Sequence, residues 1–469
     1  MFDFTGTYTD RYQLAMAEAY FLAGRSDDRA VFDYFFRDCP FGGGYALFAG
    51  LNDALKALET LRFETDDLAF LKEQGLNADF LRYLSGFRFT GTVRAAIEGD
   101  VVFPGRPVLT VEAPLIEAQL VETLLLNILN YQTLIATKAS RMRRAAGQAG
   151  LADFGLRRAQ GPGGHYAARA AVIGGFDSTS NVRAAQDYGL PLSGTMAHSF
   201  VQAHESELAA FQAFAKAHPD NCVLLVDTYD TLRSGVPNAI RVGKEMAARG
   251  DRLKGIRLDS GDLAYLSRSA RRMLDDAGLP GVKIAASNKL DETTIKSLKE
   301  QGAPIDLFGV GTNLVIGAPD GALDGVYKLV AVNARPCLKL SETREKITLP
   351  GRKQVYRLTD PDGVWLGLDG VAMADEDPPK RFDHSTDPDK RTCIGNNKLE
   401  PVLHKVMTDG KVTIPLPDVM TLQARAADRL ARLDDAYKRF DNPHLYRVGL
   451  SPRLKQARDD LARSMRRTE

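Results

Sequence analysis

The sequence predicts an α/β protein with a parallel sheet or (β/α) barrel at its centre. Between about residues 147 and 335, short apolar runs alternate with helical segments, as in a chain of βα units. Each apolar run ends in a polar or glycine-rich loop. Residues 1–130 and 336–469 instead combine strands and helices, so we expect the two ends to form one α+β domain around a barrel domain of residues 131–335.

The first 130 residues predict an α+β segment. Thr9 or Asp10 can cap a helix that carries Leu14, Ala17 and Phe21 on one face. Further along the chain we expect a strand at residues 31–36, helices at 46–61 and 66–84, a β-rich segment at 87–111, and helices at 115–129 and 134–146. The charged side chains Arg143 and Arg144 predict a solvated helix face.

The central segment supplies five apolar runs with chemically useful ends. Because loops that follow parallel strands share one face of the sheet, we expect their side chains to converge there. The runs are residues 151–152 before 153–158 (DFGLRR), 223–226 before 227–230 (DTYD), 255–258 before 259–262 (DSGD), 284–286 before 287–289 (SNK), and 306–308 before 309–312 (GVGT).

The end of the chain returns to β structure and then to helix. Strands are expected at residues 354–358 and 364–368, followed by a loop around residues 375–389. The last stretch, residues 419–469, reads as helical and carries both charge signs.

Composition indicates a soluble, intracellular globular protein. The formal net charge is +1, which gives no reason to expect nucleic acid or an anionic membrane as a partner. Four cysteines lie far apart and form no metal-binding or redox motif. The N-terminus lacks the features of a signal peptide, and the most apolar run, residues 120–129, is too short to cross a bilayer. We expect a cytoplasmic protein with reduced thiols.

The strand ends predict a site for a phosphorylated sugar that carries a carboxylate or a second phosphate nearby. Arg157, Arg158 and Arg257 suit planar anions. Three carboxylates can hold Mg²⁺ or stabilise a developing cation, and a glycine loop offers N–H groups to a terminal phosphate. These residues are Asp227, Asp259 and Asp262, with Gly309, Gly311 and Thr312 in the loop.

His198 lies in residues 194–200 (GTMAHSF), between a small-residue segment and a helix expected from about Val201, with Ser199 as a possible cap. Alone, it reads as a structural histidine in a turn. Neither a P-loop nor a Rossmann glycine pattern is present, so any use of ATP requires another arrangement.

Seven motifs in one order resemble the nicotinate phosphoribosyltransferase family, from about residue 9 to past residue 350. They are residues 9–14 (TDRYQL), 153–162 (DFGLRRAQGP), 174–181 (GGFDSTSN), 194–200 (GTMAHSF), 256–263 (IRLDSGDL), 309–312 (GVGT) and 326–330 (VYKLV).

The resemblance implies an irregular α/β barrel of the type II phosphoribosyltransferases and a homodimer with sites at the subunit interface. It implies transfer of phosphoribosyl from phosphoribosyl pyrophosphate to nicotinate, giving nicotinate mononucleotide and pyrophosphate in NAD biosynthesis. Mg²⁺ is the expected cofactor and ATP the co-substrate. Hydrolysis of ATP would be coupled through a phosphohistidine at His198.

The resemblance also implies roles for individual residues. Tyr12, delivered by the other subunit, and Phe154 would stack on the pyridine ring. Arg257, with Arg157 or Arg158, would hold the nicotinate carboxylate or the phosphates, and the motif leaves this division open. Asp259 and Asp227 would face the ribose or the metal, and the glycine loop the 5′-phosphate. Further candidates for phosphoribosyl or phosphate binding are Ser260, Gly261, Asn288, Lys138 and Arg141.

Three alternatives remain at this stage. A nicotinamide-using relative would share the fold and histidine, but adjacent Arg157 and Arg158 suit a carboxylate better than a neutral amide. A quinolinate-using enzyme would share the barrel without the histidine segment. A non-catalytic homologue that binds phosphoribosyl compounds would be stabilised by its ligand without consuming it.

Overall fold

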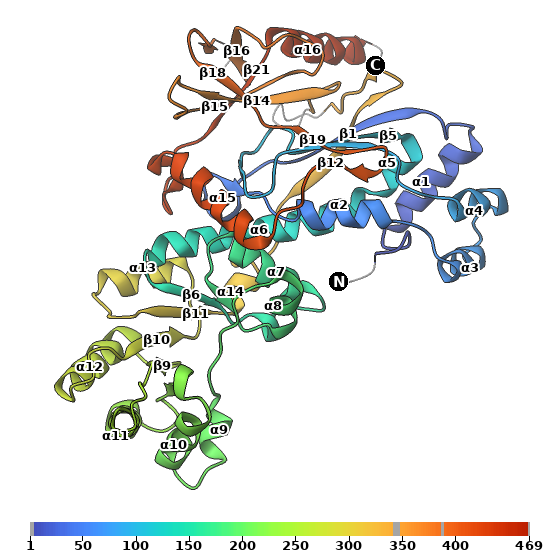
Figure 1. Cartoon of the computed structure of the whole chain (residues 1–469). Helices are drawn as coiled ribbons and strands as arrows, with labels where there is room; N and C mark the ends of the chain where they lie inside the picture. The colour runs from blue at the N-terminus through green and yellow to red at the C-terminus, as the bar shows by residue number, and fades with distance from the viewer. Residues whose placement is uncertain (1–3, 341–347, 386–388, 468–469) are drawn as a thin grey trace. The chain divides into compact units, whose positions relative to one another are not determined.

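A computed structural model describes residues 4–340, 348–385 and 389–467, which fold into two compact units (Figure 1). Unit 1 comprises Met1–Thr137, Ala322–Pro417 and Ala424–Glu469. Unit 2 comprises Lys138–Gly321 and Asp418–Gln423. Unit 1 therefore combines both ends of the chain, whereas the middle of the chain forms unit 2.

The described residues of unit 1 form three sheets. One has seven strands in the order β13-β12-β1-β5-β3-β19-β20, a second has the order β17-β16-β21-β15-β14-β18, and β2 pairs with β4. Strand β1 pairs antiparallel with both β12 and β5, so segments from opposite ends of the sequence share hydrogen bonds. The strands are β1 (Arg29–Phe36), β2 (Ala46–Leu47), β3 (Thr92–Ala95), β4 (Val101–Val102), β5 (Leu109–Pro114), β12 (Gly325–Val332), β13 (Arg335–Pro336), β14 (Lys353–Thr359), β15 (Trp365–Met373), β16 (Arg381–His384), β17 (Arg391–Cys393), β18 (Lys398–Pro401), β19 (His404–Thr408), β20 (Lys411–Val412) and β21 (Arg447–Leu450).

The first predicted helix and strand are confirmed. Helix α1 (Arg11–Leu22) follows Asp10, whose carboxylate accepts a 2.8 Å hydrogen bond from the Thr123 hydroxyl. Leu14 and Ala17 are buried on one face of the helix, as amphipathic spacing predicts. The expected strand at residues 31–36 is β1.

Two expected helices of the N-terminal segment differ from the prediction. Residues 46–61 begin with strand β2, and only α2 (Leu51–Thr60) is helical. Residues 66–84 form α3 (Thr65–Glu73) and α4 (Ala78–Ser85), because Gly75 adopts a left-handed φ of 85° that ends the first helix.

The expected break near residue 130 is also wrong. Helix α5 (Leu115–Leu120) is followed at once by α6 (Glu122–Ala146), which runs through the polar residues 130–133. Three of these polar side chains have partners in other elements: Asn130 accepts from the Tyr34 hydroxyl, Gln132 donates to Asp53, and Thr133 accepts from the Ala49 N–H. Because their polar groups have hydrogen-bond partners, these residues can be buried within a continuous helix.

The C-terminal stretch is only partly helical. Helix α15 (Val419–Arg432) and helix α16 (Pro452–Arg467) are separated by a short 3-10 turn (Asp435–Lys438) and strand β21, which pairs in parallel with β15. Pairing with an existing strand overrides the local helical tendency there. Residues 386–388 of the expected loop and the last two residues of the expected helix lie outside the described residues.

Unit 2 is built on a six-stranded parallel sheet in the order β7-β6-β11-β10-β9-β8. All five strands expected from apolar runs are present, and β7 is an addition. Helix α12 packs against β9 and β10, and helices α7 and α8 pack against β7 (Figure 1). The strands are β6 (Gly150–Asp153), β7 (Ser178–Thr179), β8 (Val223–Leu225), β9 (Gly255–Leu258), β10 (Lys283–Ser287) and β11 (Leu307–Val310), and the helices are α7 (Gly163–Ile173), α8 (Val182–Tyr188), α9 (His198–Gln202), α10 (Glu207–Ala217), α11 (Val236–Ala248), α12 (Leu263–Asp276), α13 (Glu292–Glu300) and α14 (Thr312–Val315).

The described strands leave β7 and β8 as the two edges of this sheet. A bridge between Thr179 and Leu192 extends the β7 edge, and Arg257 on β9 reaches the same segment through Thr195. The α/β class is thus confirmed, and a side-chain hydrogen bond joins β9 to the segment that follows β7. In the part of the chain that is described, no helix combines the length and apolar character needed to traverse a bilayer.

Candidate active site

The loops at the carboxyl ends of the unit 2 strands surround a cavity of about 850 Å³. This is the face where βα loops were expected to converge. Nine of the residues singled out in the sequence line it: Phe154, Arg157, Arg158, Arg257, Asp259, Asn288, Gly309, Gly311 and Thr312. The described lining residues include four Arg or Lys side chains but only one carboxylate. This excess of positive charge favours an anionic ligand.

Two carboxylates at adjacent strand ends are fixed by hydrogen bonds. One oxygen of Asp227 accepts from the Asp259 N–H at 2.8 Å and from the Ser260 hydroxyl at 2.7 Å. The Ser287 hydroxyl donates to Asp259. The second oxygen of Asp227, Oδ1, is buried and has no hydrogen-bond partner among the described residues. A buried acceptor without a donor is costly unless a ligand supplies a partner.

His198 is the first residue of α9, and 41% of its side-chain surface is exposed. Its Nδ1 lies 3.1 Å from the Thr228 hydroxyl, and its Nε2 lies 4.0 Å from an oxygen of Asp259. Thr228 therefore holds the Nδ1 side of the imidazole, and the Nε2 side faces Asp259. The expected helix start and the Ser199 cap are wrong: α9 starts earlier, and Ser206 caps the next helix, α10.

Arg257 forms a partly buried cationic corner on β9. Its guanidinium donates to Thr195 Oγ1 at 3.1 Å and to the Met196 carbonyl at 3.3 Å, and it lies 3.8 Å from Asp259. Burial lowers its pKa, Asp259 opposes this, and nearby Arg157 lowers it further. An arginine remains protonated all the same. Its Nε is buried without a partner among the described residues, so this corner retains capacity for an anion.

Phe154 lies against Gly309 of β11, and a side chain at Gly309 would collide with its ring. A Cβ there would come within 2.3 Å of the Phe154 ring. Asp153, which is fully buried, holds the turn through hydrogen bonds from the Gly155 N–H at 2.8 Å and the Thr179 hydroxyl at 2.7 Å. Gly309 thus positions an aromatic ring in the cavity as well as lining it.

The loop after β10 is conformationally strained. Asn288 and Lys289 both line the cavity and have positive φ values of 83° and 49°. Such conformations in non-glycine residues are uncommon and cluster at functional sites. Asn313 anchors the loop by donating to the Leu290 carbonyl at 3.1 Å. The strain directs an amide and an ammonium group to the cavity.

Asp262, one of the three predicted metal-binding carboxylates, is the N-cap of α12 and accepts from the Tyr265 N–H at 2.9 Å. Gly261 precedes it with a φ of 74°. The described residues contain no cluster of three or more His, Cys, Asp or Glu suited to a metal ion. A metal at this site would therefore depend on substrate oxygens for most of its ligands.

Seven of the predicted site residues are not among the described residues that line the cavity. Four of them, His198, Asp227, Ser260 and Gly261, belong to the strand-end contacts given above, and three others lie elsewhere in the chain. Lys138 and Arg141 are buried on α6 and form ion pairs with Glu292, the first residue of α13. Tyr12 belongs to unit 1 and is 51% exposed. The expected solvated role of Arg143 is wrong, because its guanidinium donates to the carbonyls of Gly175 and Ala149.

Several site residues were not assigned from the sequence. Thr228, Ser287 and Lys289 were given no role, although they belong to the predicted strand-end loops. That position in the sequence could have identified them. Asp153 and Thr179 lie in motifs, but their side chains bind each other rather than facing a ligand. Phe214, His218 and Asn221 line one end of the cavity, and their helical setting gave no indication of this.

The chain matches three family descriptions along its length. The “Nicotinate phosphoribosyltransferase (NAPRTase) family” matches residues 149–363, its N-terminal domain matches residues 7–130, and its C-terminal domain matches residues 352–458. The nicotinate phosphoribosyltransferase of Bacillus subtilis is 46% identical over 461 residues, covering 96% of this chain and 93% of its own length. The human protein of that name is 37% identical over 509 residues, covering 95% and 94%.

Solved structures agree with the sequence matches. The crystal structure of human nicotinic acid phosphoribosyltransferase matches with a TM-score of 0.87 and 35% identity, covering 97% of this chain and 99% of that one. A nicotinate-nucleotide pyrophosphorylase from Pyrococcus furiosus matches with a TM-score of 0.72 at 24% identity, which shows a shared fold. Sequence and structure therefore point to one family over nearly the whole chain.

Proposed function

The chain belongs to the nicotinate phosphoribosyltransferase family, and on this premise we propose that it joins nicotinate to phosphoribosyl pyrophosphate in NAD biosynthesis, with ATP hydrolysis coupled to the transfer. The enzyme class, phosphoribosyl transfer, follows from the family. The observation that carries the choice of substrates is the cationic corner of Arg257, Arg157 and Arg158 beside the Phe154 ring in one cavity.

Nicotinate offers a flat ring and a carboxylate, and the cavity has a partner for each. In the proposal the ring stacks on Phe154, with Tyr12 of the partner subunit on its other face in a homodimer. Arg257, which has an unpartnered buried Nε, and its neighbours bind the carboxylate or the phosphates. Exposed Leu156, Val182 and Leu192 around the cavity support a second chain as its cover.

The transfer breaks the bond between C1 of ribose and the pyrophosphate oxygen and forms a bond from C1 to the pyridine nitrogen. Positive charge develops on the sugar between these events. Asp259 and Asp227 are fixed carboxylates at the same strand ends and would stabilise that charge. The pyridine nitrogen already carries a lone pair, so the enzyme supplies position and charge rather than a general base.

Mg²⁺ fits the chemistry of this donor set. The unpartnered, buried Oδ1 of Asp227 is the type of oxygen that Mg²⁺ prefers, and Mg²⁺ commonly takes one or two carboxylates with substrate phosphates as further ligands. Asp227 and Asp259 would hold it. When bound, the ion supplies neutralising charge to the pyrophosphate leaving group.

His198 has a separate task in the proposal, the transient acceptance of the γ-phosphate of ATP. Its imidazole is partly exposed and hydrogen-bonded to Thr228. This contact fixes the ring orientation, as an orienting group does for other nucleophilic histidines. We also propose that the unit 2 sheet closes into an irregular barrel and that the protein is cytoplasmic.

Labelling with ATP that carries a γ-phosphate isotope tests the coupling. We expect an acid-labile, base-stable phosphoenzyme on the purified protein, lost in His198→Ala and retained in the control variant His204→Ala, which changes another histidine on the same segment. A label that persists in His198→Ala, or that never forms while nicotinate mononucleotide is produced, would refute the phosphohistidine. Absence of nicotinate mononucleotide under all conditions would refute the transfer.

A further inference from the structure

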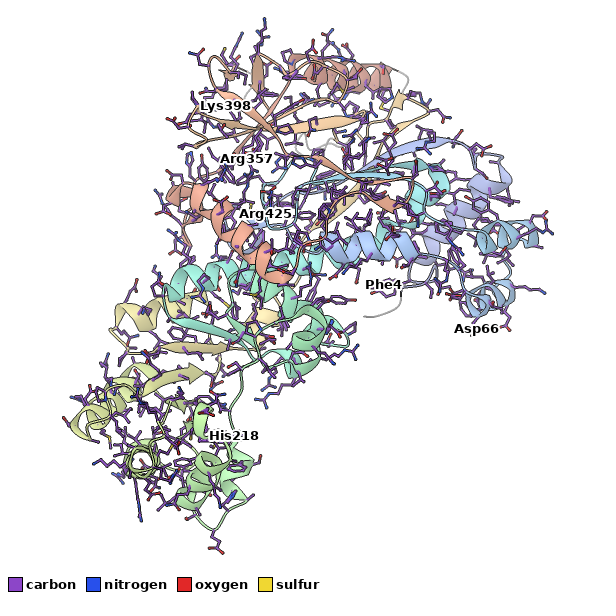
Figure 2. All side chains as sticks on the ribbon, viewed as in Figure 1. Phe4, Asp66, His218, Arg357, Lys398 and Arg425 are labelled. Atoms are coloured by element: carbon purple, nitrogen blue, oxygen red, sulfur yellow. The ribbon has the colours of Figure 1, made fainter. Side chains whose placement is uncertain are left out.

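The proposed transfer gives no role to three residues of the cavity lining that are close together in the sequence. They define what we call the α10 end of the cavity: Phe214, near the end of α10, and His218 and Asn221, which follow that helix (Figure 2 labels His218). The Phe214 and His218 rings lie 4.7 Å apart with an interplanar angle of 46°. The pair presents aromatic surface to the cavity, where a flat base can stack.

The polar groups at this end have unused hydrogen-bonding capacity. His218 and Asn221 are exposed, and among the described residues neither side chain has a polar partner. An Asn amide combines a donor and an acceptor, the pair that matches the N6 and N7 edge of adenine. Aromatic surface beside an amide is therefore suited to a purine base.

This end of the cavity is close to the proposed phosphate acceptor. Phe200 lies two residues after His198 in α9, and its ring lies 5.8 Å from the Phe214 ring. Ala197, directly before His198, lines the same cavity. A nucleotide whose base stacks on Phe214 can thus extend its phosphates along residues 194–197 toward the imidazole.

We propose that Phe214, His218 and Asn221 form a subsite for the purine base of the nucleoside triphosphate, distinct from the pyridine subsite at Phe154. The inference rests on the proposed use of ATP. The cavity volume of about 850 Å³ lies in the upper part of the range for small-molecule sites, which is consistent with two subsites in one cavity. Asn221 and the two rings select the base, while transfer chemistry stays with the strand ends.

Calorimetric titration tests the subsite with two probes, ADP and inorganic pyrophosphate, in the presence of Mg²⁺. In Asn221→Ala we expect the Kd for ADP to rise about fivefold or more, the size of a lost bidentate contact to a base. The Kd for pyrophosphate should stay unchanged. Phe214→Leu should act in the same way. Lys216→Ala, on the exposed side of the same helix, is the matched control and should bind both probes like the wild type.

Kinetics separate this inference from the proposed function. In Asn221→Ala the KM for ATP should rise while the transfer rate without ATP and the KM for nicotinate remain unchanged. Unchanged ADP binding in both Asn221→Ala and Phe214→Leu, or equal weakening of pyrophosphate, would overturn the subsite. If ATP never stimulates the wild type but ADP binding still depends on Asn221, the coupling fails and the purine subsite stands.

Discussion

Replacement of Gly309 by alanine tests how Phe154 is positioned. A Cβ at this position would lie 2.3 and 2.5 Å from two carbons of the Phe154 ring. Carbon atoms in contact are ordinarily roughly 3.5 Å apart, so the ring must move by about 1 Å. Gly309 is within β11 and lacks a positive φ, so alanine fits the strand itself. The change therefore acts on the ring and not on the sheet.

Displacement of the ring should weaken nicotinate binding. An aromatic contact contributes about 1 kcal/mol beyond its buried area, so its loss corresponds to an increase in the nicotinate KM of about fivefold. The KM for phosphoribosyl pyrophosphate should change much less. In steady-state assays the double variant Gly309→Ala/Phe154→Ala should show no further penalty over Phe154→Ala, because the clash is gone. A wild-type nicotinate KM in Gly309→Ala would refute the placement of Phe154 in the pyridine subsite.

Three other changes give distinct outcomes. His198→Ala should abolish stimulation by ATP yet leave slow transfer, measured as nicotinate mononucleotide formed with and without ATP, and complete loss of transfer in a folded variant would contradict this division. Glu292→Gln should lower the free energy of unfolding by about 3 kcal/mol in denaturant titrations, because Lys138 and Arg141 each lose a buried ion pair; an unchanged stability would show that the pairs are dispensable. Burial raises the pKa of Asp153 in the fold, so its contribution to stability is present at low pH and lost as the pH rises through that pKa. The stability of Asp153→Asn relative to wild type should accordingly increase with pH, and a constant difference would show that Asp153 does not titrate in this way.

The strands of unit 2 were predictable because buried parallel strands appear as short apolar runs. The five runs became β6, β8, β9, β10 and β11, and the ends of β6, β9, β10 and β11 with the loops after them supply about half of the cavity lining. Strand β7 was missed because its two residues, Ser178 and Thr179, are polar. The buried Thr179 hydroxyl donates a hydrogen bond to Asp153, and such a tertiary contact leaves no periodic pattern in the sequence.

Side-chain partners explain the remaining misses. Lys138 and Arg141 read as cations for a phosphate, yet each pairs with Glu292, a residue more than 150 positions further along the chain. Arg143 reads as a solvated cation but donates to the backbone carbonyl of Gly175, 32 residues further along the chain. Such long-range pairs form only in the folded chain, so the neighbouring residues in the sequence do not predict them.

The most direct test of the central claim is a comparison of nicotinate with nicotinamide, each with phosphoribosyl pyrophosphate and Mg²⁺, with and without ATP. The cationic corner around Arg257 predicts a kcat/KM for nicotinate at least 100-fold above that for nicotinamide, since charge-assisted hydrogen bonds of about 3 kcal/mol are lost with the neutral amide. The role proposed for His198 also predicts faster transfer with ATP. Equal use of the two substrates, or a preference for nicotinamide, would contradict the account of carboxylate recognition.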